Sequence, residues 1–277
     1  MPQARLIMFT DIQEALQFVF IQRALLAGCF VALCCAFLGV FLVLKRFALI
    51  GDGLAHISFA TIAIGLLLQV TPIFVSLPLV VLAALLVLRL TEKSLLYGDA
   101  AIGLLSAMGV AIGVLIASVA GGFNVDLFSY LFGNILSVSK TEVVLSVILS
   151  LLIMGVVRFF YHDLFAVTFD QDHAQVSGIK TGLVNRILVV LTALTVVLGI
   201  KVVGTMLVSS LIIFPAISAL FVATNFKTAI FLAALFSVVS VILGVFVSYI
   251  WNLPSGATIV CINCVIFIIV FFSRNRK

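Results

Sequence analysis

The sequence carries a carboxylate and an imidazole, Asp52 and His56, four residues apart in the stretch G-D-G-L-A-H. On a helix this spacing projects both side chains from one face, so they can converge on a single cation. A carboxylate with an imidazole suits zinc, manganese or iron(II), and two ligands bind weakly enough for an ion to leave a transport path. This pair is therefore the leading candidate for a metal site.

The same two residues also have a purely structural explanation. Asp52 could cap the first turn of a helix, and His56 could be a buried histidine bonded to a neighbouring carbonyl. An ionisable side chain at membrane depth costs about 2.5 to 3.5 kcal/mol on insertion scales, so such residues usually mark a pathway. His56 is the only histidine in any span expected from the sequence. The cost favours the transport interpretation.

The composition requires a lipid environment for this pair. Of the 277 residues 65% are hydrophobic and only 9% charged, whereas soluble domains have about 25% charged residues. Apolar stretches long enough to cross about 30 Å of hydrocarbon recur along residues 1–277. We expect an all-α polytopic membrane protein forming one domain, with about eight or nine transmembrane helices. The expected spans are 18–44, 54–70, 73–90, 100–120, 141–160, 183–200, 203–222, 228–250 and 256–273.

The seventh of these spans contains Ser209, Ser210 and Pro215. A proline inside a membrane helix frees backbone groups that a neighbour or a water-filled cavity must satisfy, so this segment could be broken or re-entrant. The three residues are candidates for lining a cavity. The alternative is that each serine hydroxyl bonds to its own helix backbone.

The distribution of Lys and Arg predicts an orientation, because cytoplasmic loops of membrane proteins are enriched in these residues. Placing the N-terminus outside and the C-terminus inside puts most basic residues in the cytoplasm. The stretch 161–182 is the most polar part of the chain and then also lies in the cytoplasm. We expect a partner protein to contact it. The stretch 121–140, on the external side, is expected to dip back into the interface.

Other motifs favour packing over chemistry. Gly109 and Gly113 form a G-x-x-x-G that brings two helices together, either within the subunit or between two copies. Cys261 and Cys264 have metal-ligand spacing but no accompanying pair, so packing is favoured. Phosphate-loop, H-E-x-x-H and G-x-S-x-G motifs do not occur, which argues against an enzyme. The basic residues lie at the ends of apolar runs, which argues against a nucleic-acid partner.

The stretch L-K-R-F-A-L-I-G-D-G-L-A-H, residues 44–56, resembles the signature of the manganese/zinc/iron family of ABC transporter permeases. Residues 130–134, 203–208 with 215–216, and 253–256 resemble further stretches of that family in the same order. The resemblance covers nearly the whole chain, and its first motif is highly specific.

The resemblance implies a type II importer permease fold in a bacterial plasma membrane. It implies two permease copies bound to two ATPase subunits, which receive metal from an extracytoplasmic metal-binding protein. It assigns metal coordination to Asp52 and His56, with Zn²⁺, Mn²⁺ or Fe²⁺ as cargo and no tightly bound cofactor. The L-A-H sequence without a following proline resembles the zinc branch. A coupling helix that contacts the ATPase is implied by the spacing of Asp170, Ala174 and Gly178, with Gln171 and Gln175 presented to it.

A second class of function is also open at this point. A stand-alone ion channel or proton-coupled carrier could use Asp52 and His56 as a proton relay. Uptake by the purified chain alone would distinguish it, because a permease without its ATPase shows no energised uptake.

Overall fold

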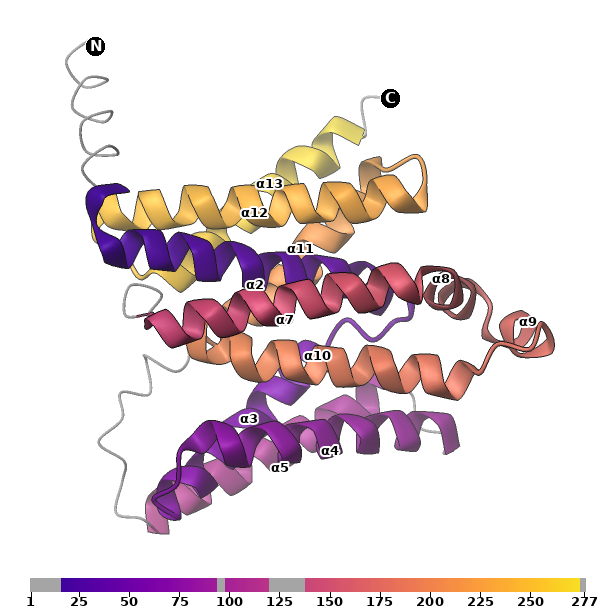
Figure 1. Cartoon of the computed structure of the whole chain (residues 1–277), viewed down its shortest axis with the longest axis horizontal. Coiled ribbons are helices and arrows are strands. Elements are labelled where there is room, and N and C mark those ends of the chain that lie inside the picture. The colour runs from indigo at the N-terminus through magenta and orange to yellow at the C-terminus, as the bar shows by residue number, and fades with distance from the viewer. Residues whose placement is uncertain (1–15, 94–97, 120–137, 275–277) are drawn as a thin grey trace.

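The computed structural model describes residues 16–93, 98–119 and 138–274, and within them every regular element is a helix. Of the external stretch 121–140 expected to dip into the interface, residues 121–137 lie outside the described residues. The helices, labelled as in Figure 1, are α2 Val19–Leu44, α3 Ile50–Leu67, α4 Pro72–Lys93, α5 Gly98–Val119, α7 Lys140–Phe159, α8 Tyr161–Phe169, α9 Gln171–Val176, α10 Thr181–Val203, α11 Thr205–Val222, α12 Phe226–Trp251 and α13 Ser255–Arg274.

Nine of the described helices are long and apolar enough to cross a membrane, which confirms the polytopic all-α prediction. The remaining two, α8 and α9, are short and lie together at one end of the bundle (Figure 1). α3 begins at Ile50, four residues before the expected start, so Asp52 lies in its first turn. α11 runs as one helix through Pro215, so the expectation of a break there is wrong.

The spans form two groups around a buried centre. α3, α4 and α5 pack together along one side, while α11, α12 and α13 pack together along the other (Figure 1). α2 and α10 lie between them, and 67% of the most apolar window of each is buried, against 22% for α5. α5 is therefore a peripheral helix, and α2 and α10 form the core.

Glycines set the closest helix approaches. A Cβ on Gly39 of α2 would collide with the backbone oxygen of Ile212 in α11. A Cβ on Gly109 of α5 would meet the backbone oxygen of His56 at 2.9 Å, and one on Gly113 would overlap Phe59. The G-x-x-x-G of α5 thus packs against α3 within the subunit, on the helix that carries Asp52 and His56.

Polar contacts tether α10 at both ends. At the end distant from α9, the Lys201 Nζ lies 3.0 Å from the Glu142 Oε1 of α7. At the end near α9, the buried Asn185 contacts three other elements, as described below. These contacts connect α10 to α7 at one end and to α4 and α9 at the other.

Candidate metal site

The structure brings Asp52 and His56 together on α3. The His56 Nε2 lies 3.5 Å from the Asp52 Oδ2, and the two side chains are 35% and 51% exposed, respectively. Both therefore remain reachable from outside the chain. The pair lies within a span, where an accessible carboxylate and imidazole attract a cation that hydrocarbon would otherwise exclude.

Two glycines hold the first turn of α3 against its neighbours. A Cβ on Gly51 would meet the Ile212 Cδ1 of α11 at 2.8 Å, and one on Gly53 would meet the Ile102 Cγ2 of α5 at 2.6 Å. Side chains at these two positions would push α3 away from both helices. The glycines flanking Asp52 therefore fix the carboxylate relative to α5 and α11.

Of the three cavity-lining candidates on α11, only Ser209 reaches the pair. The Ser209 Oγ lies 3.4 Å from the Asp52 Oδ1, and equally far from the backbone oxygen of Thr205. Ser210 is buried, and its hydroxyl has no hydrogen-bond partner among the described residues. Pro215 is buried inside α11. Ser209 thus adds a third oxygen or nitrogen group beside Asp52 and His56.

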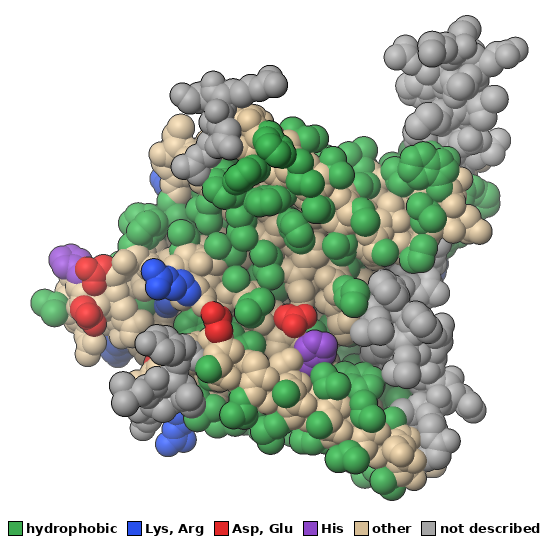
Figure 2. All heavy atoms as spheres, turned by 180° about the vertical axis from the view of Figure 1, so that it is seen from behind, with side chains coloured by type: hydrophobic (Ala, Val, Ile, Leu, Met, Phe, Trp, Pro, Cys, Tyr) green, Lys and Arg blue, Asp and Glu red, His purple; other side chains and the backbone are tan. Residues whose placement is uncertain are grey.

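By themselves these groups are too few to complete a metal shell. Within the described ranges no three His, Cys, Asp or Glu side chains gather closely enough to hold a metal ion. A tetrahedral zinc site needs four ligands, so water, a hydroxyl or another chain must supply the rest. Figure 2 shows acidic and histidine side chains side by side on a face where hydrophobic side chains predominate.

The C-x-x-C residues identified in the sequence, Cys261 and Cys264, are free thiols on α13.

The expected coupling segment folds as a short capped helix, α9. The Asp170 Oδ1 accepts a hydrogen bond from the His173 N–H at 2.9 Å and caps its start. Ala174 is 1% exposed and packs inward. Gly178 has φ +86°, and the Ile179 N–H bonds to the Ala174 oxygen at 3.0 Å, which closes the helix end. Asp170 therefore caps the start of the helix, Ala174 packs it against the rest of the protein, and Gly178 ends it in a left-handed conformation.

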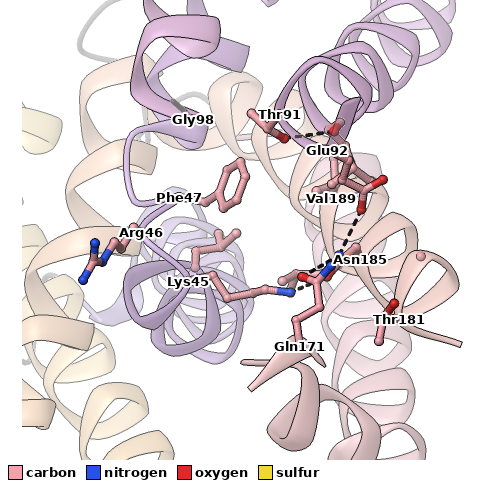
Figure 3. A pocket seen from close by; sticks show the side chains of 14 residues that line it. Lys45, Arg46, Phe47, Thr91, Glu92, Gly98, Gln171, Thr181, Asn185 and Val189 are labelled. Carbon is pink, nitrogen blue, oxygen red and sulfur yellow. Dashed lines mark hydrogen bonds between the residues drawn. The ribbon is translucent and has the colours of Figure 1, made fainter. Parts of the chain in front are cut away.

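The two glutamines of α9 differ in their surroundings. Gln175 is exposed and free to meet another chain. Gln171 is also exposed, but its Oε1 accepts a hydrogen bond from Asn185 of α10 at 3.4 Å, beside a cavity of about 630 Å³ (Figure 3). Sequence reasoning missed this polar cavity, although a lone asparagine near the start of an apolar span was a signal for it.

The nine candidate spans in the described part of the chain define a multi-pass membrane protein. The model of the ABC 3 transport family matches residues 17–274, and the chain belongs to that family. This confirms the resemblance seen in residues 44–56.

Relatives of similar identity are named for different metals. The chain is 30% identical over 264 residues to the manganese transport system membrane protein MntC of Halalkalibacterium halodurans, covering 95% of this chain and 90% of that protein. It is 30% identical over 253 residues to the high-affinity zinc uptake system membrane protein ZnuB of Haemophilus influenzae, covering 91% and 97%. The equal identities do not separate the metals.

The fold is also that of a solved transporter. The structure described as PsaBC from Streptococcus pneumoniae in complex with Fab superposes with a TM-score of 0.84 at 29% identity. The match covers 95% of this chain and 94% of that chain. The protein is therefore a permease subunit of an ABC transporter for metal ions.

Proposed function

We propose that this chain forms the transmembrane path of an importer for a divalent transition metal, with zinc as the favoured cargo. The observation that carries the proposal is the 3.5 Å approach of His56 to Asp52 within a span. One carboxylate and one imidazole match the borderline preference of zinc, manganese and iron(II). The L-A-H sequence at residues 54–56 resembles the zinc branch of the family, which supports zinc over manganese as the proposed cargo.

Weak coordination suits this role. The half-exposed carboxylate attracts the cation, the imidazole adds a second bond, and Ser209 offers a hydroxyl beside the carboxylate. The remaining positions are filled by water or by a second copy of the chain that faces the pair. A cation held by so few groups leaves when the surrounding helices move, as conduction requires.

Energy comes from separate chains. ATPase subunits bind at the end of the bundle that carries α9, where Gln175 is exposed and Asp170 and Gly178 fix the short helix. That end lies in the cytoplasm, so the N-terminus is outside and the C-terminus inside. An extracytoplasmic metal-binding protein delivers the ion at the opposite end.

Metal uptake in vesicles that hold the permease with its ATPase tests the assignment. Asp52→Ala and His56→Ala should each reduce zinc uptake to background, while the variants still copurify with the ATPase. Asp99→Ala is the matched control, because Asp99 is an exposed carboxylate at the start of α5. Normal uptake by both single variants would remove the site. Competition between zinc and manganese in the wild type would decide the preferred ion.

A further inference from the structure

The cavity of about 630 Å³ lies where α2 and α4 end and where α9 and α10 begin. Figure 3 shows four polar side chains from these elements meeting at its wall. They are Lys45, Glu92, Gln171 and Asn185, which we call the Asn185 junction. None of them belongs to the Asp52–His56 pair, so the junction is a separate polar feature of the chain.

Asn185 is the centre of the junction. It is 5% exposed, and its Nδ2 donates to the Glu92 Oε1 at 3.1 Å and to the Gln171 Oε1 at 3.4 Å. Its Oδ1 accepts a hydrogen bond from the Lys45 Nζ. Lysine can only donate and a carboxylate can only accept, so these partners fix the orientation of the amide. A single buried side chain thus joins four elements.

Lys45 brings a charge into this network. Burial lowers the pKa of Lys45 to about 8, and the nearby Glu92 carboxylate opposes that shift. The amine is therefore still protonated at neutral pH and needs its partners. The other charged groups that line the cavity are Glu92 and Arg46, and Figure 3 shows Arg46 directed away from Asn185.

The junction is connected to the metal site through the chain itself. Lys45 follows the last residue of α2 as its C-cap, and α3 starts at Ile50, so that Asp52 lies in its first turn. Gly51 and Gly53 leave no free space between this turn of α3 and its neighbours Ile212 and Ile102. A displacement of Lys45 is therefore transmitted to the first turn of α3 and cannot be absorbed by loose packing.

The junction is equally connected to α9. Gln171 is the first residue of this helix, and both helix ends are closed, by Asp170 and by Gly178. A short helix held in this way moves as a unit. A push on its exposed face therefore changes the position of Gln171 relative to Asn185.

We propose that Asn185 is a positioning residue for transport, which links movement of α9 to the Asp52–His56 pair through Lys45. This inference rests on the proposed function, because it needs an ATPase that contacts α9. When the ATPase moves α9, the Gln171 contact with Asn185 changes, Lys45 loses or regains its acceptor, and the 45–49 turn shifts α3. The adjoining cavity gives these side chains room to move.

The test measures ATP hydrolysis and zinc uptake together in proteoliposomes that contain permease and ATPase. Gln171→Leu and Lys45→Met each break one link, and Arg186→Gln is the control, since Arg186 is exposed on the neighbouring position of α10. Zinc imported per ATP hydrolysed should fall by about 5-fold or more in the two junction variants, the lower end of typical coupling between sites. The control should keep the wild-type ratio.

The outcomes separate the two proposals. Crosslinking from Gln175→Cys reports whether the ATPase contacts α9. If the ATPase is crosslinked there but both junction variants import as much zinc per ATP as the wild type, the proposed role of the junction is wrong and the proposed function stands. If no ATPase is crosslinked to Gln175→Cys, both the proposed function and the role of the junction are wrong. Asn185→Leu should reproduce the loss, but loss of this central side chain can also prevent folding, so Gln171→Leu and Lys45→Met carry the decision.

A pH series adds a readout that a purely structural role would not change. As internal pH rises through about 8, Lys45 loses its proton and its attraction to Glu92, so the wild-type ratio should fall. Lys45→Arg, which stays charged, should keep its ratio to higher pH. The same pH dependence in wild type and Lys45→Arg would overturn the role of the lysine charge.

Discussion

The Asp52–His56 pair and the Asn185 junction are both polar groups in an apolar chain, but their hydrogen-bond partners differ. Asn185 is buried, and its oxygen and nitrogen both have partners on other elements. Asp52 and His56 are partly exposed, and within the described residues their side chains contact each other and the Ser209 hydroxyl, which lies 3.4 Å from Asp52. Satisfied polar groups specify a structure, whereas unsatisfied groups are available to a ligand. The incomplete partnership supports the proposal that the pair binds the cargo.

The largest expected effect comes from removing the Asp52 charge while keeping its shape. Asp52→Asn should lower zinc uptake by at least about 100-fold, because even partners of metal ligands are worth about 10- to 100-fold. The midpoint of thermal unfolding in detergent should stay the same or rise, since a costly ionisable group is removed. A lower unfolding midpoint for Asp52→Asn would show that Asp52 stabilises the structure, as Asn185 does.

The second prediction concerns packing beside the pair. Gly109→Ala on α5 should destabilise the protein by about 1–3 kcal/mol, because the new methyl group meets the backbone of His56 and Ile57 at 2.9 Å. Gly103→Ala on the same helix is the matched control, because a Cβ there has nothing within 4 Å. Equal midpoints of thermal unfolding for the two variants would show that α3 and α5 are not in tight contact.

The third prediction separates neighbouring serines on α11. Ser209→Ala should weaken zinc binding by about 10-fold, the lower end for a group that orients a metal ligand. Ser210→Ala should leave zinc binding unchanged, because its buried hydroxyl has no partner among the described residues. Zinc affinity measured by calorimetry on the two variants compares them directly. An equal loss in both would place the effect in the backbone of α11.

The smallest effect is the pH dependence of stability at the junction. The folded-state pKa of Lys45, about 8, lies below its usual value of 10.5, so between these values the unfolded chain binds more protons. The destabilisation by the buried charge is fully present below pH 8 and is relieved as pH rises toward 10.5. The unfolding midpoint of the wild type should therefore rise over this window relative to Lys45→Met. Parallel curves would contradict a buried charge at this position.

Sequence patterns predicted the spans well because hydrocarbon imposes a strict length and composition on each helix. They also predicted the shared face of Asp52 and His56, which depends only on helical periodicity within α3. The expectation of a break at Pro215 was wrong, because α11 continues through the proline while it packs against α2, α12 and α13. The separation of Ser209 from Ser210 could not be predicted, because it depends on how α11 is rotated against α3.

The sequence by itself determined the lipid environment, the approximate position of most spans and the common face of Asp52 and His56, because these follow from composition and local spacing. Tertiary structure alone decided that Ser209 meets Asp52 and that Asn185 joins Lys45, Glu92 and Gln171. Those contacts connect residues far apart in the chain, up to 157 positions in the case of Ser209 and Asp52. Only the packing of whole helices fixes which side chains meet at such separations.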